Sequence, residues 1–449
     1  MKTLIIKNGT VIDPNSRLNK KIDIEIKQGK ITNMKPKIML EKKHEVINAK
    51  GLIIVPGFVD LHVHLREPGF THKETIKTGS LAAAKGGYTT ICAMPNTEPA
   101  IDTVKSLMNL NHIIKKDAAI NVLPIGAISK KRLGNKLTPV ASMQKNGIVA
   151  LSDDGDHLDD ESMMIEAMKK SKQFSIPISQ HCEEQALVHN GHLHEGWVSD
   201  HLGIKGRPRE AESNMVKRDI AIAEKFGGHL HIAHISTKES VKLVEKAKKY
   251  NLTVTAEVTP HHLDLTHESI GVSNIGTKIQ EPLFNTNMKV NPPLREKEDV
   301  DACIEGLNND IIDAIATDHA PHSFSEKSVV FEKAPPGISG LESAFSIGMR
   351  LVQKKKIKFE KLIDKLTYGP AKAWNLNEIK GMEGIGKIKI GHNADITLIN
   401  KSKKWTYSKQ QIISMGKNSP YIDNVFQGKV VMTLRRGKII FNQRKLEVL

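Results

Sequence analysis

Histidines and aspartates recur at five places where a short apolar run of this chain gives way to polar residues. The candidate side chains at these places are His62, His64, Asp153, Asp154, His181, His234 and Asp318. Imidazole nitrogens and carboxylate oxygens are the ligands that zinc, manganese and cobalt accept in proteins. The pattern therefore predicts a metal centre with hydrolytic chemistry.

The pair His62 and His64 is the starting point of this prediction. Alternate residues of a strand point to the same face, so both imidazoles can reach one metal. A single pair of this kind often arises by chance. Six ligand-type residues at the ends of several apolar runs do not. Six ligands exceed what one tetrahedral catalytic metal needs, so two metals that share a bridging carboxylate and a bridging hydroxide are expected.

The apolar runs before these residues predict the elements that position them. Eight candidate strands cover residues 58–62, 89–94, 120–125, 148–151, 176–181, 229–234, 253–257 and 313–317. Helical patterns lie between several of them, for example over 240–250, where Val241, Val244 and Ala247 share one face. Eight such units predict a (β/α)8 TIM barrel, which carries its catalytic groups at the C-terminal ends of the strands.

Both ends of the chain look different from the middle. Ile22, Ile24 and Ile26 alternate with charged residues before a Gln28-Gly29 turn, and segments 386–400 and 428–442 each predict a pair of short strands. We therefore expect a small β-sandwich domain built from both termini, residues 1–54 and 385–449, beside a barrel domain over 55–384.

Composition narrows the class of protein further. The net charge is +16, yet the lysines are scattered and aromatic residues are not interleaved with them, which argues against a nucleic-acid binder. No apolar run approaches the roughly 20 residues of a membrane helix. Three widely spaced cysteines predict no disulfide framework and favour the cytoplasm. Aromatic residues make up only 4% of the chain, so the core should be aliphatic.

Motifs along nearly the whole chain resemble those of the amidohydrolase superfamily, and in particular the longer bacterial dihydroorotases. The resemblance rests on DLHVHLREPG (60–69), AMPNTEP (93–99), SDDG (152–155), HCE (181–183), HISTKES (234–240), EVTPHHL (257–263), KVNPPLR (289–295), ATDHAPH (316–322), PPGISGLES (335–343) and KNSPY (417–421). They stand in the order of the family. The resemblance implies a dihydroorotase that interconverts N-carbamoyl-L-aspartate and (S)-dihydroorotate in pyrimidine biosynthesis.

The resemblance also implies roles for the candidate ligands. His62 and His64 would hold the first of two Zn2+ ions, His181 and His234 the second, and Asp154 would bridge them, with Mn2+ or Co2+ as other fitting metals. Many relatives use a carboxylated lysine as the bridge, but no lysine ends the fourth predicted strand. Asp153 is expected to have a structural role. Asp318 would touch the first metal and act as general acid/base.

A substrate site follows from the same resemblance. Arg66 stands two residues past the metal pair, and its planar guanidinium suits a carboxylate. Asn96 and His322 would join Arg66 on the substrate carboxylate, and Asn291 would hold the ring amide. Pro336 and Gly337 would line the ring through backbone groups.

Two alternatives and several partners stay open at this point. A dihydropyrimidinase or allantoinase has less use for Arg66, Asn96 and His322, and an inactive scaffold subunit should have lost ligands. The family suggests a homodimer and an association with aspartate carbamoyltransferase. A loop with His189, His192, His194 and His201 could imitate a further metal site, but a polar loop beside the barrel is favoured.

Overall fold

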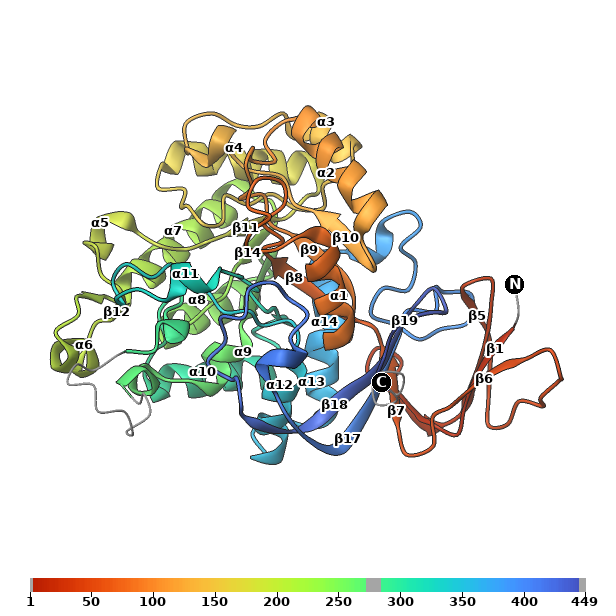
Figure 1. The fold of residues 1–449 in the computed structure, drawn as a ribbon. Coiled ribbons are helices and arrows are strands. Elements are labelled where there is room, and N and C mark those ends of the chain that lie inside the picture. The colour runs from red at the N-terminus through yellow and green to blue at the C-terminus, as the bar shows by residue number, and fades with distance from the viewer. Residues whose placement is uncertain (1–2, 272–283, 444–449) are drawn as a thin grey trace.

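The computed structural model describes residues 3–271 and 284–443 of the 449-residue chain. Its centre is a ring of parallel strands (Figure 1). The strands of the ring are β8 (Phe58–Val63), β9 (Tyr88–Ala93), β10 (Asn121–Pro124), β11 (Ile178–Gln180), β14 (Leu230–Ile232), β15 (Val254–Val258) and β16 (Ala314–Ile315). A parallel bridge between Val63 and His319 closes the ring, so the (β/α)8 barrel is confirmed.

The fourth predicted strand differs from the others. Leu151 forms single parallel bridges to Gly126 and to Ile178, and no continuous strand covers 148–151. The segment still joins the barrel, because Val149 N donates to Pro124 O and Leu151 N donates to Pro177 O. Both acceptor residues are prolines. A proline has no N–H to donate back to this segment, so the ladder of backbone hydrogen bonds stays short.

Helices surround the ring and cover it from outside. The helices are α1 (Ile76–Gly86), α2 (Val104–Asp117), α3 (Val140–Lys145), α4 (Glu161–Phe174), α5 (Gln185–Val188), α6 (Trp197–Leu202), α7 (Glu210–Phe226), α8 (Lys238–Lys249), α9 (Pro260–Asp264), α10 (Lys297–Asn308), α11 (Phe324–Lys327), α12 (Ala344–Gln353), α13 (Phe359–Leu366) and α14 (Tyr368–Ala373). In α8 the predicted face is buried, and the Thr237 side chain caps its first turn.

Strands from the two ends of the chain form two further sheets at one side of the barrel (Figure 1). The first has the order β5 (Lys30–Lys35), β4 (Asp23–Lys27), β1 (Leu4–Lys7), β6 (Glu45–Asn48). The second has the order β19 (Lys438–Asn442), β18 (Val425–Arg435), β17 (Ile396–Thr406), β7 (Ile53–Pro56), β2 (Thr10–Asp13), β3 (Leu18–Lys21). A two-stranded pair, β12 (Leu193–His194) and β13 (Gly206–Arg207), lies apart from both.

An aliphatic cluster with members from both sheets, including Ile6, Ile24, Ile54 and Leu398, makes the pair of sheets a sandwich built from both termini, as predicted. The domain boundaries themselves stay a prediction.

The prediction of strands at 386–395 was wrong. Gly386 and Gly391 have φ of 70° and 88°, and the chain turns there because Lys387 N donates to Gly384 O and His392 N to Lys389 O. The turning segment closes on β5, where Gly391 N donates to Ile31 O.

Aliphatic residues dominate the barrel core, as the composition predicts. Within the two described stretches, every helix falls short of the length and apolarity that crossing a membrane requires.

Candidate active site

The six predicted ligands come together at the C-terminal mouth of the barrel. His62 lies in β8 and His64 follows its end, while His181 comes directly after β11. His234 and Asp318 lie two and three residues past β14 and β16, where both adopt positive φ, 30° and 45°. A non-glycine residue in this region is strained, and such strain concentrates at functional sites.

His62, His64, Asp154 and Asp318 form the first cluster. The Nε2 atoms of His62 and His64 lie 3.4 and 3.3 Å from Asp154 Oδ2. The same two nitrogens lie 3.5 and 3.1 Å from Asp318 Oδ1. His62, His64 and Asp154 therefore offer three donor atoms close enough to hold one ion, and Asp318 lies beside the two histidines.

His181 and His234 form the second cluster on the other side of Asp154. His181 Nδ1 lies 2.9 Å from His234 Nε2. These nitrogens are 3.5 and 3.2 Å from Asp154 Oδ1. Asp154 thus presents one carboxylate oxygen to each cluster, which is the arrangement of a bridging ligand.

The donor spacings fit divalent metals. Ligands about 2.1 Å from a tetrahedral zinc ion lie about 3.4 Å from one another, and both clusters have separations close to this value. Among the described residues, His62 Nε2 is buried and has no hydrogen-bond partner. A buried nitrogen of this kind needs a ligand, so the residues fit a metal on each side of Asp154.

Electrostatics keep both aspartates ionised. Burial opposes the charged form of Asp154, but His62, His181 and His234 hold its pKa well below the usual range. For Asp318, burial is likewise outweighed by His62 and His64, and its pKa is lowered. Both side chains are therefore carboxylates at neutral pH, as a metal ligand and a proton acceptor must be.

Neighbouring side chains orient the histidines. His62 Nδ1 lies 2.7 Å from Glu257 Oε1, and His64 Nδ1 lies 2.8 Å from Asn96 Oδ1. Each contact places a proton on Nδ1 and leaves Nε2 free to bind a metal. Glu257 also contacts His231 Nε2 at 3.2 Å, and the two histidines lower its pKa to about 2 despite burial.

Replacing Glu257 tests this support. Glu257→Gln keeps the size and one acceptor oxygen but removes the charge that holds the His62 ring. We expect metal affinity to fall about 10–100-fold, the usual effect of such outer partners. Competition with a chelator of known affinity measures it, and an unchanged affinity would contradict the role given to Glu257.

Asp153 is bonded to the loop after β10 and not to the predicted metal ligands, which agrees with the structural role expected for it. Its carboxylate accepts hydrogen bonds from Ile128 N, Ser129 N and Ser129 Oγ. These bonds fasten the loop after β10 to the segment that carries Asp154.

A cavity of about 230 Å³ opens over the predicted metal ligands. It is lined by five of the six predicted ligands and by every predicted substrate contact, namely Arg66, Asn96, Asn291, His322, Pro336 and Gly337. His62 lies behind this wall. The structure thus brings all the predicted site residues to one place, although the role of each toward metal or substrate stays a proposal.

Arg66 and His322 form one side of the cavity, and Arg66 carries the positive charge there. Arg66 Nη2 lies 3.4 Å from His322 Nε2, and Arg66 Nε donates to Pro321 O. Burial lowers the pKa of Arg66 to about 10, so its guanidinium stays charged at neutral pH. Burial and the Arg66 charge lower the pKa of His322 to about 2, so His322 acts as a neutral hydrogen-bond partner.

Asn291 is already engaged by protein groups. Its Oδ1 accepts a hydrogen bond of 2.7 Å from Arg207 Nη1, and its Nδ2 lies 3.2 Å from His181 Nε2. Arg207 is in turn paired with Glu183. These contacts fix the amide beside His181 of the second cluster.

Gly337 adopts a backbone conformation that only glycine tolerates here. Its φ is 140°, and a Cβ would lie 2.7 Å from the Cβ and O atoms of Ala320. Two buried lysines hold its segment, because Lys327 Nζ donates to Pro335 O and Lys289 Nζ donates to Phe331 O and Glu332 O.

A separate group of possible ligands, His194, Glu296 and Asp299, lies away from this cavity. Arg209 already pairs with both carboxylates, and Arg295 Nη1 lies 3.1 Å from His194 Nδ1. Burial and Arg295 lower the pKa of His194 to about 3. The group is an ion-pair cluster, which agrees with the preference for a polar loop around these histidines.

Sequence reasoning missed several residues of the site. Glu257 carried a signal, since an acidic residue inside an apolar strand must find a buried partner. Arg207, Lys289 and Lys327 gave none, because ordinary surface lysines and arginines look the same in a sequence.

A parallel barrel with paired histidine–aspartate clusters at its strand ends defines a metal-dependent hydrolase of the amidohydrolase class. A family model described as Dihydro-orotase-like matches residues 51–240. The dihydroorotase of Bacillus cereus (strain AH820) is 42% identical over 440 residues, which cover 98% of each chain. That of Elusimicrobium minutum (strain Pei191) is 42% identical over 445 residues, 99% of each chain. The chain therefore belongs to the dihydroorotase family of cyclic-amide hydrolases.

Solved structures of related hydrolases share the fold. The L-hydantoinase (dihydropyrimidinase) of Arthrobacter aurescens superposes with a TM-score of 0.85 at 22% identity, over 98% of this chain and 96% of that one. The dihydropyrimidinase of Brevibacillus agri NCHU1002 gives 0.82 at 23% identity, over 98% and 95%. At this identity the likeness supports the barrel and β-domain architecture alone.

Proposed function

We propose that this cavity interconverts N-carbamoyl-L-aspartate and (S)-dihydroorotate. The observation that carries the proposal is Arg66, a half-buried cation that lines the same cavity as the candidate metal ligands and lies beside His322. A cyclic amide with a ring carboxylate can place its acid group on this side and its reactive carbonyl over Asp154 and Asp318. The family supports the same reaction.

The metal side of the cavity supplies the chemistry of hydrolysis. Two divalent ions, with zinc as the first choice, would be held by His62, His64, Asp154, His181, His234 and Asp318. Ions bound there lower the pKa of bound water and polarise a substrate carbonyl. His62 and His64 enter this site pre-oriented by Glu257 and Asn96.

Asp318 is the residue we assign to proton transfer. Its carboxylate lies at the edge of the first cluster, is kept ionised by His62 and His64, and borders the cavity. It can accept a proton from the attacking water and deliver it to the ring nitrogen that leaves. In the biosynthetic direction the same carboxylate removes a proton from the carbamoyl nitrogen.

The other lining groups orient the ring. Arg66, Asn96 and His322 would bind the carboxylate, and the backbone of Pro336 and Gly337 would border the ring. Asn291 lines the cavity with its amide beside His181, so it can face the ring amide, as the family implies.

A substrate comparison tests the function. Purified protein supplied with Zn2+ or Mn2+ is assayed on dihydroorotate, hydantoin and allantoin, and we expect turnover of dihydroorotate alone or at far higher kcat/KM. Activity confined to hydantoin or allantoin would overturn the choice. No bound metal and no activity after metal addition would favour an inactive scaffold, which the complete set of six ligands argues against.

Arg66→Lys should weaken substrate binding more than catalysis. A lysine keeps the charge but loses the planar fork, and charge-assisted hydrogen bonds are worth about 1.5–3 kcal/mol. We expect KM for dihydroorotate to rise about 10–100-fold with a small change in kcat. Arg218→Lys is the matched control, since Arg218 lines another cavity. Equal KM for wild type, Arg66→Lys and Arg218→Lys would show that Arg66 does not bind the substrate carboxylate.

Assembly and location are further proposals from the family alone. Homodimerisation predicts a particle near twice the chain mass of 49.8 kDa in light scattering. An association with aspartate carbamoyltransferase and a cytoplasmic location would need co-purification and fractionation.

A further inference from the structure

Asn418 joins three segments that are far apart in the sequence. Its Nδ2 donates hydrogen bonds to Ala320 O at 3.0 Å and to Gly337 O at 2.9 Å. Its Oδ1 accepts from His322 N and from Ser339 Oγ, both at 2.9 Å. A primary amide has two donor hydrogens and two acceptor lone pairs, so Asn418 is fully used.

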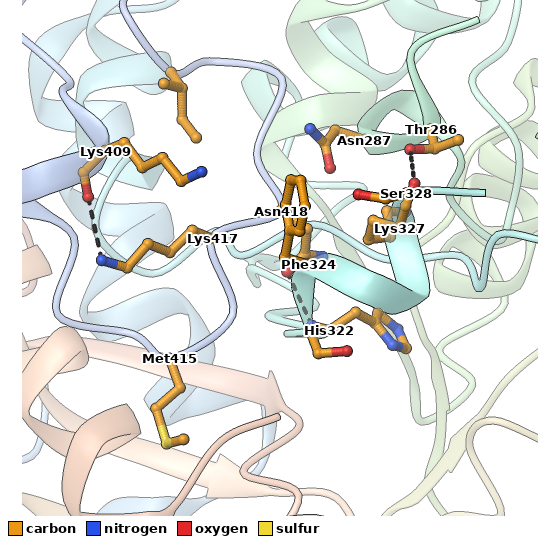
Figure 2. Close-up of a pocket in the computed structure, with 12 residues that line it drawn as sticks. Thr286, Asn287, His322, Phe324, Lys327, Ser328, Lys409, Met415, Lys417 and Asn418 are labelled. Atoms are coloured by element: carbon orange, nitrogen blue, oxygen red, sulfur yellow. Dashed lines mark hydrogen bonds between the residues drawn. The ribbon is translucent and has the colours of Figure 1, made fainter. Parts of the chain in front are cut away.

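The two segments that Asn418 connects are walls of the active-site cavity. One carries Asp318, Ala320 and His322, and the other carries Pro336 and Gly337. Figure 2 shows Asn418 next to His322, with the hydrogen bond between them drawn as a dashed line, at the edge of a second cavity behind His322. Asn418 does not line the substrate cavity, so it acts on substrate only through its neighbours.

The chain around Asn418 is also held close to these walls. A Cβ on Gly416 would lie 2.4 Å from Pro321 Cβ and 2.8 Å from His322 N, so only glycine fits. Ser339 Oγ donates to Gly416 O at 2.6 Å, and Ser339 N donates to the Asn418 carbonyl at 2.9 Å. The connection between β17 and β18 of the terminal sheets thus reaches the barrel mouth and contacts its walls at Gly416 and Asn418.

We propose that Asn418 is a positioning residue that sets the spacing between the His322 segment and the Pro336–Gly337 segment. It thereby fixes the recess that receives the ring and carboxylate of the substrate. This inference rests on the proposed function. It gives the C-terminal part of the chain an indirect part in substrate binding, through the residues that line the cavity.

The chemistry of the contacts explains why an amide stands here. An aspartate would keep both acceptor bonds but would turn an oxygen toward the carbonyls of Ala320 and Gly337, which need donors. It would also add a negative charge next to His322, the residue that contacts Arg66, and so oppose a substrate carboxylate. An alanine would remove all four side-chain bonds. The two segments would then depend on their direct contacts, Ala320 N to Ile338 O and His322 Nε2 to Pro336 O.

Two variants and a control test the proposal. Asn418→Ala and Asn418→Asp are compared with Asn424→Ala, which changes an asparagine of the same connection whose contacts are Arg350 and Ile422 O. We expect KM for dihydroorotate to rise at least tenfold in both Asn418 variants while kcat stays within about threefold. The Kd of orotate, an unreactive ring acid, should rise in parallel, and metal content should stay at the wild-type level.

The outcomes separate the possible roles. A KM and an orotate Kd within twofold of wild type in folded Asn418 variants would overturn the proposal. Failure of both variants to fold, or an equal rise of KM in Asn424→Ala, would make Asn418 merely structural and would also reject it. If the unmodified chain itself does not turn over dihydroorotate in this assay, the proposed function fails instead.

Discussion

Asp318→Asn should abolish turnover in both directions while substrate still binds. An asparagine fills the same space and can still offer an oxygen to the first metal, but it cannot accept the proton. General acid–base catalysis contributes about 10²–10⁴-fold, so kcat should fall by at least two orders of magnitude. The measurement is initial rates for ring opening and for ring closure, together with the Kd of dihydroorotate by calorimetry.

The metal content of Asp318→Asn is the necessary control. Asp318 Oδ1 lies within 3.5 Å of both histidine nitrogens of the first cluster, so the substitution could also weaken metal binding. A full complement of metal with a lost kcat assigns the defect to proton transfer. Near-normal turnover in either direction would show that another group moves the proton.

The strand-end pattern was enough to predict which side chains meet at the barrel mouth, because the barrel brings the C-terminal ends of its strands together whatever their separation in sequence. His62 and Asp318 are 256 positions apart in number and still meet, since β8 and β16 neighbour each other in the closed ring. The choice of Asp154 over Asp153 followed from the family, and the geometry shows its physical basis. Asp153 is occupied by Ile128 and Ser129, whereas Asp154 faces four imidazoles.

Other features could not be predicted because they depend on contacts that no local pattern encodes. Asn418 lies in a polar connection, and nothing there indicates that its amide reaches both His322 and Gly337. The missing fourth strand depends on two prolines of neighbouring segments, Pro124 and Pro177. The glycines at 386–391 were predicted to form the turn of a strand hairpin. In the structure the chain turns twice over this short segment, so no strand forms there.

Asp154→Asn should reduce the number of bound metals from two to one and remove turnover. A carboxylate has an oxygen for each cluster, while an amide has one oxygen and an NH2 group that cannot bind a metal. Substitution of a residue that only supports a metal ligand already lowers metal affinity about 10–100-fold. Loss of a direct ligand should therefore lower the affinity for the second ion by more than that. Metal content by mass spectrometry after dialysis, and kcat at saturating metal, measure the effect.

Asp153→Asn is the matched control for this prediction, since it makes the same chemical change one residue away. Its carboxylate serves Ile128 N and the Ser129 N–H and hydroxyl groups, so the variant should lose stability, by about 1–3 kcal/mol, and keep its metal. Asp153→Asn should have a lower Tm than wild type and the same metal content. Asp154→Asn should bind half as much metal, and its Tm should equal that of wild type when both proteins are compared without metal. If Asp154→Asn retains two metals per chain, the bridge must come from another ligand, and the division of Oδ1 and Oδ2 between the clusters would have no functional meaning.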